Sequence, residues 1–184
     1  RKIHTVIVVI DTSSLLSLVR YYLPFDNNNV LFDFIKSKIE NQEIIVLDKV
    51  FQESFYTAKG IVIEKLDYLK LKKNQVNTTD LLPSPKFFKQ MEHNFINGSA
   101  KNKLSTVEFE NRKNTFLELA DAKLLLYALE NKSDNVIIIS EETESSNDSK
   151  SFKKIPAICK FLNLDILTLT ELFEKYPEIT FEFR

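Results

Sequence analysis

The chain has 184 residues, of which 43% are hydrophobic and 28% are charged, and its formal net charge at pH 7 is −1. This composition can supply a globular core, and the small net charge excludes a global attraction to nucleic acid or to an acidic membrane. Two glycines cannot build a glycine-rich phosphate loop, and one cysteine cannot form an internal disulfide. No apolar run approaches the roughly 18–20 residues that cross a bilayer, so we expect one cytoplasmic domain over residues 1–184 with no membrane segment.

The first part of the chain is expected to alternate strands with helices. Runs of β-branched residues at 5–10 and 43–47 predict two buried strands. After the first strand, Ser13 or Ser14 is expected to cap a short helix. Apolar residues recur at helical spacing over 31–39, so a second helix is expected before the second strand.

The middle of the chain is predicted to be mostly helical. Asp48 is expected to cap a helix that follows the second strand. Residues 61–119 are also expected to be mainly helical, with breaks at Pro83, at Pro85 and at the Asn97-Gly98 pair.

The last third returns to the alternation and indicates the fold class. Continuously apolar strands between helices predict an α/β fold, with a central parallel sheet flanked by helices on both faces. All strands of such a sheet end at one edge, and binding sites lie outside that edge. The elements expected here are a helix over 122–129, a strand over 136–139, a helix over 155–164 with Pro156 in its first turn, a strand over 165–169, a helical turn capped by Thr170, and an edge strand in "ITFEF".

Acidic residues lie at the positions that this topology brings to the carboxyl edge of the sheet. They are Asp11 after the first strand, Glu53 in the helix after the second, Asp121 at the start of the helix before the third, and Glu141 and Glu142 after the third. Clustered hard oxygen ligands suit Mg²⁺ or Mn²⁺, which can activate water for attack on a phosphodiester. Each acid also has an ordinary role open to it, as a helix cap, a helix-dipole partner or a solvated charge.

Four short segments resemble the motifs of the PIN-domain ribonucleases. "VIVVIDTSSLL" is similar to the first motif, in which a strand ends on an acid with a hydroxyl or Asn residue two positions on. "VFQESF", "LADAKLLLYALE" and "NVIIISEE" are similar to the second, third and fourth motifs, and "KIPAIC" resembles a larger, toxin-like subgroup. The resemblance spans residues 5 to about 175. It implies a PIN-like fold with an extended helical segment between the second and third acidic motifs.

The resemblance also implies a ribonuclease that depends on Mg²⁺ or Mn²⁺. Its catalytic acids would be Asp11, Glu53, Asp121 and Glu142, of which Asp11, Asp121 and Glu142 would hold the metal. Glu53 would complete the site directly or through water. The fourth acid is a glutamate here, where the family commonly has an aspartate.

Two serines would support these acids. Ser13 would hydrogen-bond the first aspartate, and Ser140 precedes the fourth acid. Glu142 is preferred to Glu141 because the family usually places the acid two positions after the hydroxyl residue. The extended segment could serve substrate choice, dimerisation or the core, so a homodimer is one expected arrangement.

The partner implied by the resemblance is RNA. Lys153 and Lys154 are candidate phosphate contacts, because their loop follows the third strand at the same edge. Many members of the family are toxins that a small antitoxin protein silences.

Two other functions stay open. One is a PIN-like scaffold that binds RNA or protein without cutting, since the fourth acid is substituted. The other is an aspartyl-phosphate phosphatase, although Ser13 stands where those enzymes usually carry a second aspartate.

Overall fold

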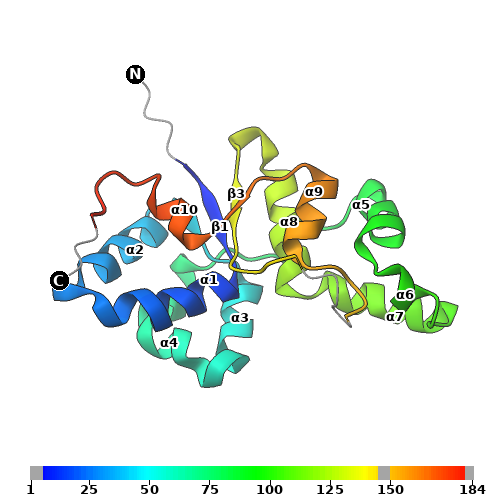
Figure 1. The fold of residues 1–184 in the computed structure, drawn as a ribbon, viewed down its shortest axis with the longest axis horizontal. Coiled ribbons are helices and arrows are strands. Elements are labelled where there is room, and N and C mark those ends of the chain that lie inside the picture. The colour runs from blue at the N-terminus through cyan, green and yellow to red at the C-terminus, as the bar shows by residue number, and fades with distance from the viewer. Residues whose placement is uncertain (1–5, 145–149, 181–184) are drawn as a thin grey trace.

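The computed structural model describes residues 6–144 and 150–180. A four-stranded sheet with strand order β2-β1-β3-β4 forms its centre, and every neighbouring pair of strands is parallel. The predicted α/β class with a central parallel sheet is therefore confirmed (Figure 1). The strands are β1 (Val8–Ile10), β2 (Ile44–Ile45), β3 (Ile137–Ile139) and β4 (Ile166–Leu167).

The two inner strands form the centre of the hydrophobic core. Val8 pairs with Ile137 and Ile10 pairs with Ile139. All three residues of β1 are fully buried. Because helices cover both faces of the sheet, the strands are continuously apolar rather than alternating.

Helices cover the sheet and also extend beyond it. In Figure 1, α2 and α10 lie on one side of β1, α8 and α9 lie on the other, and α5, α6 and α7 reach furthest from the sheet. No helix in the described ranges is long and apolar enough to cross a membrane. The helices are α1 (Thr12–Ser17), α2 (Val30–Glu40), α3 (Asp48–Tyr56), α4 (Ile61–Lys65), α5 (Pro85–Gln90), α6 (Gly98–Lys101), α7 (Thr106–Leu117), α8 (Ala120–Glu130), α9 (Ile155–Leu162) and α10 (Leu169–Phe173).

The predicted cap of the first helix is wrong. The residue that caps α1 is Asp11, whose carboxylate accepts a hydrogen bond of 2.7 Å from the Thr12 amide, and Ser13 and Ser14 lie inside the helix. The Asp11 amide still donates to the carbonyl of Ile139, so the sheet ladder and the helix meet at this one residue. The strand therefore passes into the helix with no loop between them.

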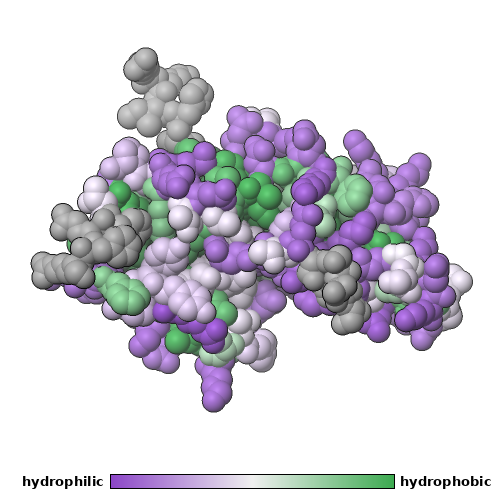
Figure 2. Space-filling view, in the orientation of Figure 1, coloured by the Kyte–Doolittle hydropathy of each residue, from purple (hydrophilic) through white to green (hydrophobic). Residues whose placement is uncertain are grey.

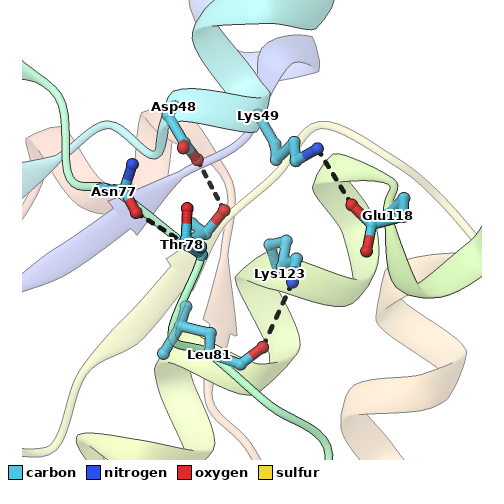
Figure 3. A network of polar contacts seen from close by, with 8 residues as sticks. Asp48, Lys49, Asn77, Thr78, Leu81, Glu118 and Lys123 are labelled. Carbon is cyan, nitrogen blue, oxygen red and sulfur yellow. Dashed lines mark hydrogen bonds and ion pairs between the residues drawn. The ribbon is translucent and has the colours of Figure 1, made fainter.

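Two other predicted caps are also wrong, because in each case the helix begins earlier in the chain than the sequence indicates. Asp48 lies in the first turn of α3, where its carboxylate accepts a hydrogen bond of 2.6 Å from the Thr78 hydroxyl (Figure 3). Thr168, rather than Thr170, caps α10 through a reciprocal capping box with Glu171. In both places the helix begins closer to the preceding strand than the sequence indicates.

The segment 61–119 is mostly helical, as predicted, but several of its helices are short 3₁₀ or π turns. Between α4 and α5 the chain forms short 3₁₀ turns and extended backbone, and Val76 makes a parallel bridge to Leu47 beside the sheet. Pro85 does not break a helix but begins α5, where proline is tolerated because the first helical amide has no partner. The predicted break at Asn97-Gly98 is confirmed, because the preceding helical turn ends at Phe95 and α6 begins at Gly98.

The phenylalanines of this segment mainly fill a local core. Phe87, Phe95 and Phe116 are at most 3% exposed, and Phe87 and Phe95 pack edge to face. Figure 2 shows a mainly hydrophilic surface over α5, α6 and α7 on the face that it presents. Of the roles left open for these rings, the structure therefore supports the core.

Two predicted strand ends lie outside the described residues. Thr5, at the start of the first predicted strand, is one of them. The "ITFEF" segment reaches into 181–184, and Ile179 and Thr180, which are described, belong to no strand.

We predict that Ile138→Ala lowers the free energy of unfolding by about 2–5 kcal/mol, because it opens a cavity in a fully buried inner strand. Ile166→Ala, in the half-buried strand β4, is the matched control and should cost roughly half as much. Urea denaturation of both variants measures the difference. Equal losses would mean that the core is not centred on β1 and β3.

Candidate functional site

A cleft opens at the carboxyl edge of the sheet, and the four predicted acids line it. Asp11 follows β1, Glu53 lies in α3, Asp121 lies in the first turn of α8, and Glu142 follows β3. The structure therefore brings together carboxylates that are far apart in the sequence. The residues lining the cleft are Asp11, Thr12, Ser13, Leu16, Glu53, Thr57, Leu119, Asp121, Glu142 and Lys150.

Asp11 is the most firmly held of these acids. Its side chain is 4% exposed, and one carboxylate oxygen accepts the helix-capping bond from the Thr12 amide. The other oxygen accepts hydrogen bonds from the hydroxyls of Ser13, at 2.6 Å, and Ser140, at 2.9 Å. These donors offset the cost of burying a charge at the end of a strand.

The same two serines join the start of α1 to the chain that leaves β3. The Ser13 hydroxyl accepts a hydrogen bond from the amide of Glu141, and the Ser140 hydroxyl accepts one from the amide of Glu142. The two hydroxyl oxygens lie 3.3 Å apart. Both predicted supporting residues thus fix the backbone beside the acids as well as contacting Asp11.

Thr12 is a site residue that the sequence reasoning missed. Its buried hydroxyl donates a hydrogen bond of 2.6 Å to the carboxylate of Glu53, an exposed side chain. The sequence feature that could have pointed to Thr12 is the run of three hydroxyl residues after Asp11. Each of these three residues has a different role. Thr12 orients Glu53 and Ser13 orients Asp11, whereas the buried Ser14 hydroxyl has no hydrogen-bond partner among the described residues.

The structure separates Glu141 from Glu142. The Glu141 carboxylate accepts a hydrogen bond of 2.6 Å from the Leu169 amide at the start of α10 and does not line the cleft. Glu142 lines the cleft, and its carboxylate accepts a longer bond of 3.3 Å from the Ile155 amide at the start of α9. Burial raises the pKa of Glu142, and the charge of Asp11 raises it further.

The environment of Asp121 disfavours the charged form of its carboxyl group. Burial, followed by the negative charges of Asp11, Glu142 and Glu53, raises the pKa of Asp121 from 3.8 to about 7. Within the described ranges, no hydrogen-bond donor reaches its carboxylate. A carboxylate that has lost water without gaining a donor is stabilised by a cation.

The donor set fits a hydrated Mg²⁺ or Mn²⁺. Carboxylate oxygens are the ligands that these hard cations prefer. In the described part of the chain, no group of three or more Asp, Glu, His or Cys side chains is placed so that it could hold a metal ion. Mg²⁺ usually keeps several waters and uses one or two carboxylates, so an open acidic cleft suits it better than a closed cage would.

A polar network next to the cleft ties together the helices that carry two of the acids (Figure 3). Lys49 at the start of α3 forms an ion pair of 3.1 Å with Glu118, just before α8. Lys123 in α8 is 5% exposed and donates to the carbonyl of Leu81 at 3.2 Å. These contacts hold α3 and α8 in register beside the sheet.

The two predicted lysine contacts differ in environment. The Lys153 ammonium donates to the carbonyl of Asn94 at 2.8 Å and lies 4.6 Å from the centre of the Phe161 ring, so it stabilises the fold. Lys154 precedes α9, and its positive charge lowers the pKa of Glu142 against the larger effect of burial. Of the two, Lys154 is the better placed to meet an anion near the cleft.

Comparison with known families identifies a family that covers most of the chain. A family model described as "Domain of unknown function (DUF4411)" matches residues 8–180. Comparison with curated proteins and with solved structures gives no match.

We predict that Asp121→Asn stabilises the metal-free protein at pH 8 by roughly 1–3 kcal/mol. The folded state holds the Asp121 proton up to about pH 7 and the unfolded state only up to about 3.8, so stability falls as the pH rises through this window. The variant should therefore match the wild type near pH 4 and exceed it at pH 8. Denaturant titrations in chelator at the two pH values measure this.

Asp165→Asn is the matched control for this prediction, because Asp165 is exposed and lies at the amino end of β4, away from the cleft. It should change stability little at either pH. If Asp121→Asn is no more stable than Asp165→Asn at pH 8, the four acids do not repel one another as the cleft geometry requires.

Proposed function

This chain belongs to the DUF4411 family, and we propose that it is a ribonuclease that cuts RNA phosphodiester bonds with Mg²⁺ or Mn²⁺. The observation that carries the proposal is the acidic cleft, in which the half-buried Asp121 lies with three other carboxylates and has no hydrogen-bond donor within the described residues. The resemblance to PIN-domain ribonucleases concerns the same four acids. Residue positions and electrostatics thus support one interpretation.

The proposal assigns a role to each acid. Asp11, Asp121 and Glu142 would hold the metal, and Ser13 and Ser140 would keep the Asp11 carboxylate oriented. When bound, the metal would supply Lewis acidity that activates water and stabilises charge on the phosphate.

Glu53 would accept a proton from the attacking water. Its side chain is exposed to solvent, and the Thr12 hydroxyl holds its carboxylate at the rim of the cleft. A proton acceptor must lie within hydrogen-bond reach of the water that it activates, and a fixed orientation favours this.

The family resemblance extends the proposal to a toxin that a small antitoxin protein blocks. Such a partner would have to cover the acidic cleft, because substrate must reach the acids there. This part of the proposal rests on the resemblance alone.

We predict that Glu142→Gln weakens Mn²⁺ binding about tenfold or more, and that Glu141→Gln leaves it nearly unchanged. Glu142 lines the cleft, whereas the Glu141 carboxylate accepts the Leu169 amide and should affect the docking of α10 instead. Isothermal titration calorimetry with Mn²⁺ distinguishes the two variants. Weaker binding in Glu141→Gln alone would assign the fourth acid to Glu141.

We predict that the protein cuts single-stranded RNA with Mn²⁺ or Mg²⁺, stops in chelator, and loses about a hundredfold or more of its rate in Asp121→Asn. Asp121→Asn is the sharper test, because Asp11→Asn would also disturb three hydrogen bonds. Cleavage of a labelled oligonucleotide measures the rate, and a chromogenic phosphomonoester tests for a phosphatase. Undiminished RNA cleavage by Asp121→Asn, or turnover of the monoester alone, contradicts the proposal.

A further inference from the structure

A second hollow continues from the acidic cleft. The two share Leu119, Asp121, Glu142 and Lys150 along their common boundary. Beyond this boundary one wall is α7, with Arg112 and Thr115, and the other is the segment 150–154. We call this hollow, which runs from Asp121 and Glu142 to Arg112 and Lys154, the α7 groove.

The floor of the α7 groove is apolar. Phe116 of α7 stacks on Phe152 with ring centres 4.3 Å apart and ring planes inclined by 21°. Both rings are buried, whereas Leu119 is 49% exposed at the junction with the acidic cleft. Leu119 is therefore the part of this floor on which the face of a base can pack, since packing on apolar groups does not depend on base sequence.

The walls of the α7 groove are fixed before any ligand arrives. The backbone of 150–154 pairs with the end of the α5 region, where the Asn97 amide donates to Ser151 and the Lys153 amide donates to Phe95. The Asn97 side-chain amide also donates to the Lys150 carbonyl at 2.8 Å. A preformed groove binds with a smaller entropy cost than a loop that must first become ordered.

Cations line both walls of this groove, with Arg112 on α7 and Lys150, Lys153 and Lys154 on the segment 150–154. Arg112 is exposed and forms no hydrogen bond or ion pair in the described part of the chain, with the charge of Glu108 one helical turn away. Lys154, on the other wall, acts electrostatically on Glu142. Positive charge on the rim and apolar surface on the floor complement a single strand, whose phosphates and bases lie on different sides.

We propose that a single-stranded RNA substrate leaves the acidic cleft along the α7 groove, with a phosphate held by Arg112 and Lys154 and the adjoining base packed on the exposed side chain of Leu119, which the buried Phe116–Phe152 stack supports. This rests on the proposed function for the cleavage site itself. It gives the extended segment between the second and third acidic motifs a substrate-binding role, because that segment supplies α7 and the residues that pin 150–154.

Binding of a fluorescein-labelled oligouridine, measured by anisotropy in Mn²⁺, tests the groove. The Asp121→Asn background serves for all variants, because it prevents cleavage and reduces the negative charge that phosphates meet. In this background Arg112→Ala and Lys154→Ala should each weaken binding roughly threefold to tenfold at 0.1 M salt. Each should also lower the slope of log affinity against log salt by about 0.7.

Lys72→Ala is the matched control, since it removes one exposed positive charge at the opposite end of the sheet. The neighbouring Lys73 carbonyl accepts from Gln42, which lies just before β2. Lys72→Ala should keep both the affinity and the salt slope. Circular dichroism and thermal melts of each variant verify the fold.

The outcomes separate this inference from the proposed function. If Arg112→Ala and Lys154→Ala bind RNA like Lys72→Ala while the wild type still cuts RNA, the proposed role of the α7 groove is wrong and the proposed nuclease function is retained. If these two variants lose affinity for RNA but the wild type cuts no RNA, the α7 groove binds RNA and the proposed nuclease function is wrong. Equal affinity for a blunt RNA duplex would also overturn the groove, because stacked and paired bases cannot reach its floor.

Discussion

The structure depends on how a carboxylate can stand at the end of a buried strand. Asp11 follows three fully buried residues of β1 and is itself 4% exposed. Without donors such a charge would cost several kcal/mol, and the protein supplies a backbone amide and two serine hydroxyls. Those serines also accept hydrogen bonds from the backbone amides that follow β3. The same two side chains therefore solvate Asp11 and assemble the carboxyl edge of the sheet.

The other three acids of the cleft are less well solvated than Asp11. Their solvation decreases from Glu53 through Glu142 to Asp121. Glu53 is exposed and accepts a hydroxyl, and Glu142 accepts one long bond from a backbone amide. Asp121 is half-buried and has no donor among the described residues, and desolvation together with the neighbouring carboxylates raises its pKa to about 7. A fold that maximised its own stability would not keep this arrangement, and such a cost is typical of a site shaped for a ligand.

The segment between the second and third acidic motifs joins the core to the site. Its phenylalanines fill a local core, and the stack of Phe116 on Phe152 carries that packing up to the cleft. The buried Lys113 pairs with Glu110 within α7 at 2.8 Å and with Glu92 at 2.6 Å, and the second pair joins α7 to the π-helical turn that follows α5. The α7 wall of the groove is therefore held by both an ion pair and a ring stack.

The sequence by itself determined the fold class and the position of the acids, because runs of β-branched residues and helical spacing are local signals. Residues 5–10, 43–47 and 136–139 contain the strands that form, and Asp11, Asp121 and Glu142 follow or open elements as those patterns predict. It did not place every helix start, and the predicted caps of α1, α3 and α10 lie later in the chain than the observed caps Asp11, Leu47 and Thr168. Whether Asp11 or Ser13 caps α1 depends on where the sheet ladder ends, and that point is set by Ile139.

Only the tertiary structure decided which side chains meet at the site. Glu141 and Glu142 are chemically identical neighbours, and the Leu169 amide, 28 residues from Glu141, takes one of them out of the cleft. Ser13 and Ser140 are 127 positions apart, and no local pattern links Thr12 to Glu53 or Arg112 to Lys154. Hydrogen bonds and shared grooves depend on distances of a few ångströms between segments, and packing sets those distances after the local elements have formed.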